Sequence, residues 1–434
     1  KIYLLGELFS YEDPKLNNFQ IISYLNQFKS INQIFTEISK FYGEFIFIYR
    51  TKNKLIIFND ACSQREIYYS NNFTSFAASI KLISYSEKLL SYNDSDALSF
   101  YSSKKFKDSP IFIGNTTDIK NIKHLEPNHF INISEKFKKR FFPLFIKQKN
   151  DLATTAKLAG EMIKGYLKAI SIRHKKLVIP LTSGYDSRVL FLASLDLNCE
   201  YYVSKHLWMN DSHPDILISK KLAGLFGKKI NIIADKKNEN KYFEDDYVFS
   251  VDHPRGINFP EFTKNKVIIN GNISEVARCY YVRLKNVSAL NLIFLNKLYR
   301  NKFVLKTYKN WIVKNFKILK KLNYDIMDMF YWEEKMGIML AKMKSEASAI
   351  GIHVKTPYNS RKLLNIMLGV DQKYRNNFET KLYDEIIKNL CNNPIVYQIP
   401  VNPSRERVFF ILLKKLSILN IYLLLRMRFK QLFI

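Results

Sequence analysis

The chain has 434 residues, of which 47% are hydrophobic, and its formal net charge is +29. That length allows about three domains and that apolar fraction is ample for buried cores, while the absence of internal repeats and low-complexity linkers excludes a solenoid or a largely disordered chain. The charge suggests anionic partners such as nucleotides, nucleic acid or a phospholipid surface, although the abundance of Lys, Asn, Ile, Tyr and Phe resembles the bias of an AT-rich genome and explains much of the charge by itself.

The first part of the chain is dominated by short segments rich in aromatic and β-branched residues. Polar turns join these segments, which predicts an antiparallel meander. The segments are residues 43–49, 54–59, 66–69 and 72–77.

Two further stretches of this region resemble a known family. Residues 6–11 read Gly-Glu-Leu-Phe-Ser-Tyr and are similar to the Asn-Gly-Glu-Ile-Tyr-Asn strand in the glutaminase domain of class II glutamine amidotransferases. Residues 125–129, Leu-Glu-Pro-Asn-His, resemble the Leu-x-Pro-Gly-His hairpin of the same domain. The resemblance implies that residues 1–150 form a partial Ntn-hydrolase-like antiparallel sandwich of the α+β class.

The glutaminase nucleophile of that family is an N-terminal Cys whose own amino group acts as the base. This chain begins with Lys1, so we expect either a truncated domain or a glutaminase remnant, and no glutamine hydrolysis by the chain as given. The cysteines that are present are widely spaced, and we expect them to be free thiols in a reducing compartment. They are Cys62, Cys199, Cys279 and Cys391.

A polar stretch at residues 147–155 is the predicted boundary to a second domain, and the most informative motif follows it. The apolar run around Ile179 predicts a short buried strand, residues 182–187 a turn of small polar side chains, and residues 189–195 a helix. Such a turn directs backbone N–H groups and hydroxyls to the positive end of the helix dipole, which suits a phosphate or pyrophosphate. An ordinary Asp-Ser helix cap is the alternative interpretation.

Strands and helices alternate after this turn. Further strands are predicted at residues 200–204, 229–233 and 266–270, with a helix at residues 214–226. The alternation predicts a parallel, doubly wound sheet, and ligands of such sheets lie at the carboxyl ends of the strands.

The turn is similar to the pyrophosphate-binding loop Ser-Gly-Gly-x-Asp-Ser of the N-type ATP pyrophosphatases, with Ser183 in place of the first Gly. Residues 270–278 resemble the segment Ser-Gly-Glu-Gly-x-Asp-Glu of asparagine synthetases, shortened by one residue. These resemblances imply an adenine nucleotide α-hydrolase-like α/β domain over residues 151–404 that binds ATP and Mg²⁺, with Asp186 and Glu275 as the metal ligands. The nucleotide-binding residues that they imply are Thr182, Ser183, Gly184, Asp186, Ser187, Val203, Ser204, Asn270 and Gly271.

Cationic side chains are expected to complete the site. Residues 355–359, Lys-Thr-Pro-Tyr-Asn, resemble the Arg-x-Pro-Phe-Leu-Asp segment of the family, which implies that Lys355 is a catalytic residue in addition to Asp186. The substrate-side Lys of asparagine synthetases has no counterpart in residues 394–400. We assign its replacement to Arg375. The other candidates are Lys373, Arg405 and Arg407.

The rest of the chain, from about residue 281, is predicted to be mostly helical. Residues 405–434 mix apolar runs with Lys and Arg, and are too charged at their centre for a good membrane span. They predict a terminal helix packed on the domain, with contact to a membrane surface or a partner as the alternative. The other helices are predicted from apolar residues at three- and four-residue spacing. They are residues 311–321, 324–349, 361–368 and 378–390.

From Gly6 to about Pro403 the sequence resembles asparagine synthetase-like ligases. The resemblance implies a cytoplasmic, AMP-forming ligase that adenylates a carboxylate with ATP, releases pyrophosphate and passes the acyl group to ammonia or an amine. The alternatives are a non-catalytic scaffold that keeps the fold, and a nucleic-acid-modifying enzyme with the same loop. Nucleic acid is not the expected partner, because the N-terminal part does not resemble a known RNA-binding module.

Overall fold

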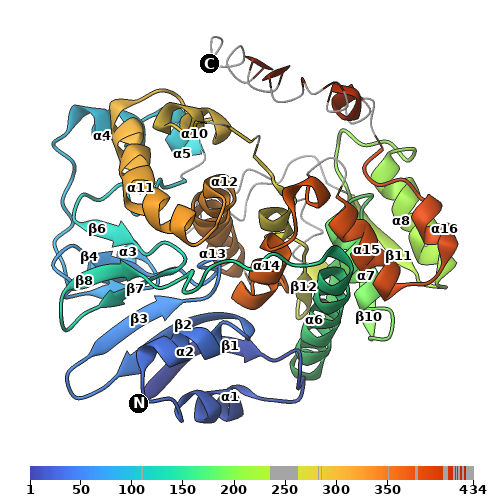
Figure 1. Ribbon diagram of the computed structural model, residues 1–434, viewed down its shortest axis with the longest axis horizontal. Coiled ribbons are helices and arrows are strands. Elements are labelled where there is room, and N and C mark those ends of the chain that lie inside the picture. Colours follow the sequence, from blue (N-terminus) through green and yellow to red (C-terminus); the bar gives the residue numbers. More distant parts are fainter. Residues whose placement is uncertain are drawn as a thin grey trace.

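The computed structural model contains antiparallel sheets from the N-terminal part of the chain and a parallel sheet from the central part. The segments predicted as one antiparallel meander divide between two sheets, with residues 43–49 and 54–59 in one and residues 66–69 and 72–77 in the other. Figure 1 shows the antiparallel strands, coloured blue to blue-green, at a different end of the molecule from the parallel strands, which lie among green, yellow and red helices. The described residues are 1–108, 111–234, 262–281, 283–284, 286–349, 351–376, 380–403 and several positions between 409 and 426.

The antiparallel sheet has five strands in the order β1-β2-β3-β7-β8. A three-stranded sheet in the order β5-β4-β6 packs against it through Ile57, Tyr69 and Leu125, so this part of the chain is a sandwich. The strands of the larger sheet are β1 (Ile2–Phe9), β2 (Tyr42–Arg50), β3 (Leu55–Asn59), β7 (His129–Asn132) and β8 (Phe137–Arg140). Those of the smaller sheet are β4 (Tyr68–Ser70), β5 (Phe76–Ala77) and β6 (Ile122–His124).

Helices α1 (Asn18–Leu25) and α2 (Ile31–Ile38) lie over the other face of the five-stranded sheet (Figure 1). Both begin at a capping box, in which the cap side chain and the third helical residue bond each other's backbone N–H groups. Phe35 of α2 packs on Phe58 of the sheet, with ring centroids 5.1 Å apart. Because β2 is covered on both faces, most of it is buried, and its residues 45–49 are a continuous apolar run rather than an alternating one.

The parallel sheet has five strands in the order β11-β10-β9-β12-β13. The chain runs outward from β9 to β11 and then returns to place β12 on the other side of β9. This reversal creates a topological switch point between β9 and β12, where open sheets of this kind bind their ligands. The sequence predicts the first four of these strands and misses the three-residue β13. The five strands of the parallel sheet are β9 (Leu177–Pro180), β10 (Cys199–Lys205), β11 (Ile230–Ala234), β12 (Val267–Ile269) and β13 (His353–Lys355).

Helices surround the parallel sheet and fill the space between the two sheets (Figure 1). The longest, α6 (Leu152–Arg173), begins within the predicted boundary region, and the side chain of Asp151 caps it. Helix α15 (Lys381–Leu390) packs against α6 and α7, and residues 378 and 379, at its predicted start, lie outside the described residues. Further helices of the described residues are α3 (Ile80–Ile83), α4 (Ser95–Tyr101), α5 (Lys104–Asp108), α7 (Tyr185–Ala193), α8 (Pro214–Leu225), η1 (Ser274–Arg278), α10 (Ala289–Leu295), α11 (Lys302–Lys321), α14 (Arg361–Leu368), η3 (Gln372–Tyr374) and α16 (Pro394–Gln398).

The helix predicted at residues 324–349 is not a single regular α-helix. It consists of α12 (Ile326–Phe330), a ten-residue π-helical segment η2 (Tyr331–Leu340), and α13 (Ala341–Ala349). Glu333 and Glu334, which are adjacent in η2, are both buried against the N-terminal sandwich and its neighbours. The spacing of apolar residues predicts a helix here but cannot distinguish the wider π turn.

Glu334 should make the stability of the protein depend on pH. Its Oε2 accepts the N–H of Gly114 at 2.9 Å, and burial raises its pKa from 4.5 to about 8. Between these values the folded protein keeps a proton that the unfolded chain loses, so this group lowers the free energy of unfolding as pH rises from about 4.5 to about 8. We expect Glu334→Gln to remove this decrease. Denaturant titrations should then show that the free energy of unfolding of the variant increases relative to that of the wild type as pH rises. A difference between the two proteins that is constant over this range would contradict the prediction.

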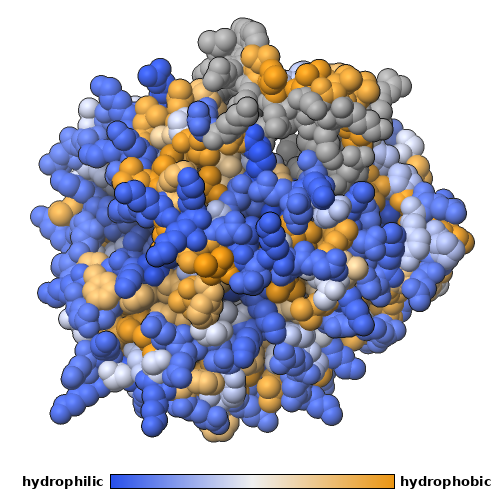
Figure 2. Space-filling view, viewed as in Figure 1, coloured by the Kyte–Doolittle hydropathy of each residue, from blue (hydrophilic) through white to orange (hydrophobic). Residues whose placement is uncertain are grey.

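In the part of the chain that the structure describes, no helix is both long enough and apolar enough to span a membrane. Figure 2 shows hydrophilic residues over most of one face, with apolar residues interspersed. Residues 405–434, where the sequence predicts a basic terminal helix, lie mostly outside the described residues, and Arg405 and Arg407 are among those not described.

Candidate functional site

The turn of small polar residues lies where the sequence places it, between β9 and α7 at the switch point of the parallel sheet. The backbone N–H of Thr182 donates to Oγ of Ser187 at 3.1 Å, and the two hydroxyl oxygens are 2.9 Å apart. Gly184 is the N-cap of α7, and among the described residues no side chain caps this helix. Helix α7 begins at Tyr185, four residues earlier than predicted, so its positive end lies directly in the turn.

A carboxylate from the next helix already occupies two donors of the turn. Asp215, in the first turn of α8, accepts hydrogen bonds through Oδ1 from the N–H of Ser183 at 2.8 Å and from its hydroxyl at 2.6 Å. The N–H of Asn402 donates to the carbonyl oxygen of Ser183 at 3.0 Å. A phosphate that used the donors of Ser183 would therefore have to displace Asp215.

Removing the charge of Asp215 should strengthen anion binding by the turn. We expect Asp215→Asn to bind inorganic pyrophosphate about tenfold more tightly than the wild type, because the competing charge-assisted hydrogen bonds to Ser183 are weakened. Calorimetric titration measures the change. Asp211→Asn is the matched control, since it removes the same charge from the exposed Lys205–Asp211 pair on the preceding loop. Equal affinities of the two variants would contradict the prediction.

The segment after β12 packs closely on the turn. A Cβ atom at Gly271 would lie 2.5 Å from Cβ of Asp186, so only glycine fits there without displacing the turn. Two residues of η1 then contact the Asp186 carboxylate: the Ser274 hydroxyl donates to Oδ1, and Nη2 of Arg278 lies 3.0 Å from Oδ2. The sequence predicts the proximity of Gly271 to the nucleotide site but does not single out Ser274 or Arg278.

Glu275 forms a cluster with Asp186 and Arg278. Its Oε1 is 3.4 Å from Nη2 of Arg278, and burial and the negative charge of Asp186 together raise its pKa to about 7, against the opposing charge of Arg278. Within the described residues, neither Oε2 of Glu275 nor Nε of Arg278 has a hydrogen-bond partner, although both atoms are buried. The cluster therefore contains one unused acceptor and one unused donor.

The predicted magnesium ligands are close together, but in this arrangement they do not fit a metal ion. The guanidinium of Arg278 contacts both Asp186 and Glu275 and places a positive charge between the carboxylates that would coordinate the ion. A divalent cation there would be repelled by Arg278, and Mg²⁺ also requires near-octahedral oxygen ligands. In the described part of the chain, no group of three or more His, Cys, Asp or Glu side chains is arranged to hold a metal.

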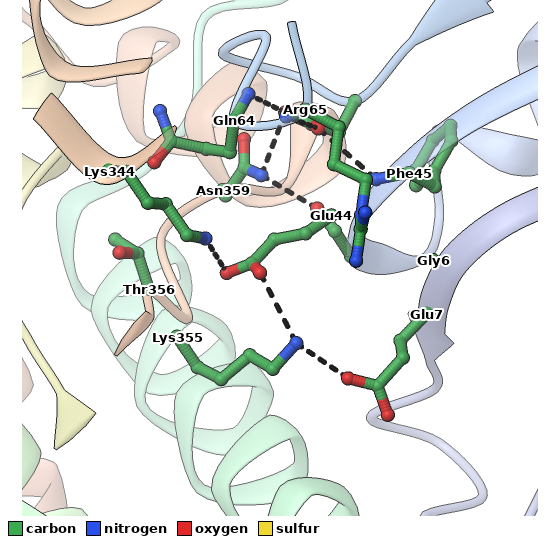
Figure 3. A network of polar contacts seen from close by, with 12 residues as sticks. Gly6, Glu7, Glu44, Phe45, Gln64, Arg65, Lys344, Lys355, Thr356 and Asn359 are labelled. Carbon is green, nitrogen blue, oxygen red and sulfur yellow. Dashed lines mark hydrogen bonds and ion pairs between the residues drawn. The ribbon is translucent and has the colours of Figure 1, made fainter. Parts of the chain in front are cut away.

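Lys355 lies in a network of ion pairs that does not include the turn (Figure 3). Its ammonium is 2.5 Å from Oε2 of Glu7 and 3.2 Å from Oε2 of Glu44, and Lys344 forms a further ion pair with Glu44. Burial alone would raise the pKa of Glu7, but His174 and Lys355 lower it to about 2. Lys355 thus joins β13 of the parallel sheet to β1 and β2 of the antiparallel sheet, and it does not point to the predicted nucleotide site.

Arg375, the predicted replacement for the missing Lys, is fully buried. It donates to the carbonyl oxygens of Val370 at 2.8 Å and Ala277 at 3.3 Å, and Nη2 lies 3.1 Å from Asp328. These bonds hold Arg375 inside the protein, so it cannot contact a substrate in this arrangement. Lys373, another candidate for this role, lies in η3, where its backbone N–H is bonded to Asp371.

The remaining predicted residues lie at the same edge of the parallel sheet as the turn. Val203 and Ser204 are near the carboxyl end of β10, Val203 buried and Ser204 half-buried. Asn270 follows β12, and its Oδ1 accepts the hydroxyl of Thr356 at 2.8 Å. The sheet therefore brings the predicted nucleotide-binding residues together, because the carboxyl ends of parallel strands meet at one edge.

A scan of the sequence against protein-family models gives no match, and a search of curated proteins gives none either.

Proposed function

We propose that the chain is an ATP-dependent, asparagine synthetase-like ligase, which joins a carboxylate to ammonia or an amine through an acyl-adenylate. The observation that supports this most is the small-polar turn before α7, which lies at the switch point of the parallel sheet with Gly271 packed against it. In this proposal residues 1–150 are an Ntn-hydrolase-like domain, and residues 151–404 are an adenine nucleotide α-hydrolase-like domain.

The proposed chemistry uses the turn for binding rather than for covalent catalysis. The uncapped N-terminus of α7 would hold the β- and γ-phosphates of ATP, with the hydroxyls of Thr182 and Ser187 beside them and adenine near Ser204 and Gly271. A substrate carboxylate would attack the α-phosphorus and release pyrophosphate, after which the amine would displace AMP. The protein would contribute by holding the carboxylate in line and by balancing the developing negative charge with the helix dipole.

Exchange of labelled pyrophosphate into ATP tests this proposal. Reversal of adenylation incorporates the label only when a suitable carboxylate is present, so a panel of amino acids, sugar acids and peptides reports the substrate class as well as the activity. We expect exchange with one class of carboxylate substrate. Gly184→Asp should lose this exchange, because the variant places a carboxylate at the N-terminus of α7, where the phosphates would bind. Binding of ATP without exchange for any carboxylate would contradict the ligase reaction.

A second candidate, a non-catalytic scaffold, is favoured by one group of observations. Asp215 occupies the donors of Ser183, and Arg278 occupies the carboxylates predicted to hold magnesium. The two basic residues predicted to act in catalysis, Lys355 and Arg375, are both held in buried ion pairs. A scaffold predicts no ATP binding by the folded protein, which distinguishes it from the ligase.

A further inference from the structure

Arg278 introduces a permanent positive charge into the candidate nucleotide site. Its Nη2 atom is 3.0 Å from Oδ2 of Asp186, which is part of the turn, and 3.4 Å from Oε1 of Glu275. An arginine side chain stays protonated at any pH at which the protein is folded. The site therefore contains a cation bonded to both carboxylates that the sequence predicts as metal ligands.

Packing fixes the position of this guanidinium. The Arg278 side chain is 9% exposed, and its guanidinium lies over the ring of Tyr383, 5.7 Å from the centroid. The hydroxyl of Tyr383 donates to the carbonyl oxygen of Ser274 at 2.9 Å, which holds the ring against η1. Such contacts contribute little to stability when the arginine is exposed. The buried Arg278, in contrast, is part of the structure that positions Asp186.

The guanidinium also has a hydrogen-bond donor that the protein does not use. Among the described residues, no partner accepts from Nε of Arg278, although the atom is buried. Buried donors are nearly always satisfied by protein, water or ligand, so an unused N–H beside an uncapped helix N-terminus favours an anionic oxygen as its partner. Arginine binds phosphate oxygens through such charge-assisted bonds.

We propose that Arg278 takes the place of the divalent metal in this site, so that the turn binds the pyrophosphate portion of its nucleotide without magnesium. The inference rests on the proposed function, because it concerns the same turn. The positive charge of Arg278 offsets part of the negative charge of Asp186 and Glu275, which favours the approach of a polyphosphate, and it repels a metal ion that would otherwise bind these carboxylates. Arg278 is thus the residue that determines the ionic requirement of the site.

Calorimetric titration of inorganic pyrophosphate into the whole chain tests the proposal, first in EDTA and then in excess MgCl₂. We expect binding in EDTA, with an affinity that does not rise when magnesium is added. A rise of about tenfold or more on adding magnesium would overturn the proposal. Absence of binding under both conditions, with the protein folded, would overturn the function proposed for the turn as well, so the two failures are distinguishable.

Two variants separate the charge of Arg278 from its packing. Arg278→Met should lose at least about tenfold of the affinity in EDTA, and magnesium should restore binding because Asp186 and Glu275 are then free to hold the ion. Arg278→Lys keeps the charge and should bind in EDTA more tightly than Arg278→Met. A purely structural role would lower the affinity of Arg278→Met equally with and without magnesium, which would contradict the proposal. If Arg278→Met does not fold, the pyrophosphate affinities of the wild type and of Arg278→Lys, measured with and without magnesium, test the proposal.

Discussion

Replacing Lys355 by alanine is expected to lower the free energy of unfolding by about 3–5 kcal/mol, because it leaves the carboxylates of Glu7 and Glu44 without their shared cation. The three side chains join the antiparallel and parallel sheets in a mostly buried network (Figure 3). Denaturant unfolding measures the loss. The matched control is Lys362→Ala, which breaks the more exposed pair with Glu12 and should cost less than about 1 kcal/mol.

The same variant distinguishes two roles for Lys355. If the lysine is structural, the folded fraction of Lys355→Ala should bind pyrophosphate with the affinity of the wild type, since the side chain does not point to the turn. If stability is retained and the affinity falls, Lys355 acts at the nucleotide site, as the resemblance implies, and the structural interpretation is wrong.

Replacing Glu333 by alanine is expected to have a similarly large effect, also about 3–5 kcal/mol of unfolding free energy. Its carboxylate is fully buried and accepts hydrogen bonds from both terminal nitrogens of Arg140, from Nε1 of Trp311 at 3.1 Å and from Asn128 at 3.2 Å. Removing it leaves the guanidinium of Arg140, which is only 8% exposed, without its anion.

Thermal and denaturant unfolding of Glu333→Ala should be compared with those of Glu135→Ala. Glu135 is exposed in the turn between β7 and β8, near Arg140 in sequence, and its removal should change the unfolding free energy by less than about 0.5 kcal/mol. Similar stabilities for the two variants would show that the π-helical segment does not anchor the N-terminal sandwich through this carboxylate.

The sequence predicts those features of the fold that depend on local pattern. The turn at residues 182–187 lies between a strand and a helix, as predicted, because an apolar run, small polar residues and a helical repeat are all encoded within a few neighbouring positions. The alternation of strands and helices also predicts the parallel sheet, and hence that the turn and Gly271 meet at one edge. β13 is missed because its sequence His-Val-Lys has a single apolar residue, whereas the equally short β12 is the apolar run Val-Ile-Ile.

The features that the sequence does not predict depend on partners distant along the chain. Lys355 lies at the end of β13, but the direction of its side chain is set by Glu7 and Glu44, more than three hundred residues earlier in the chain. The contact of Asp215 with Ser183 follows from the position of α8 beside β10, which no local pattern contains. The position of Arg278 three residues after Glu275 is the one signal that could have indicated their pairing.

Calorimetric titration of ATP into the wild type and into two variants of Gly184, the N-cap of α7, tests the nucleotide site most directly. Gly184 has ordinary extended backbone angles, and a Cβ there would meet its nearest neighbours at 3.4 and 3.5 Å, so a side chain at this position should be compatible with folding. We expect the wild type and Gly184→Ser to bind ATP, and Gly184→Asp to fold but not to bind. Equal binding by all three proteins, or none by the folded wild type, would contradict the claim that this turn is a nucleotide site.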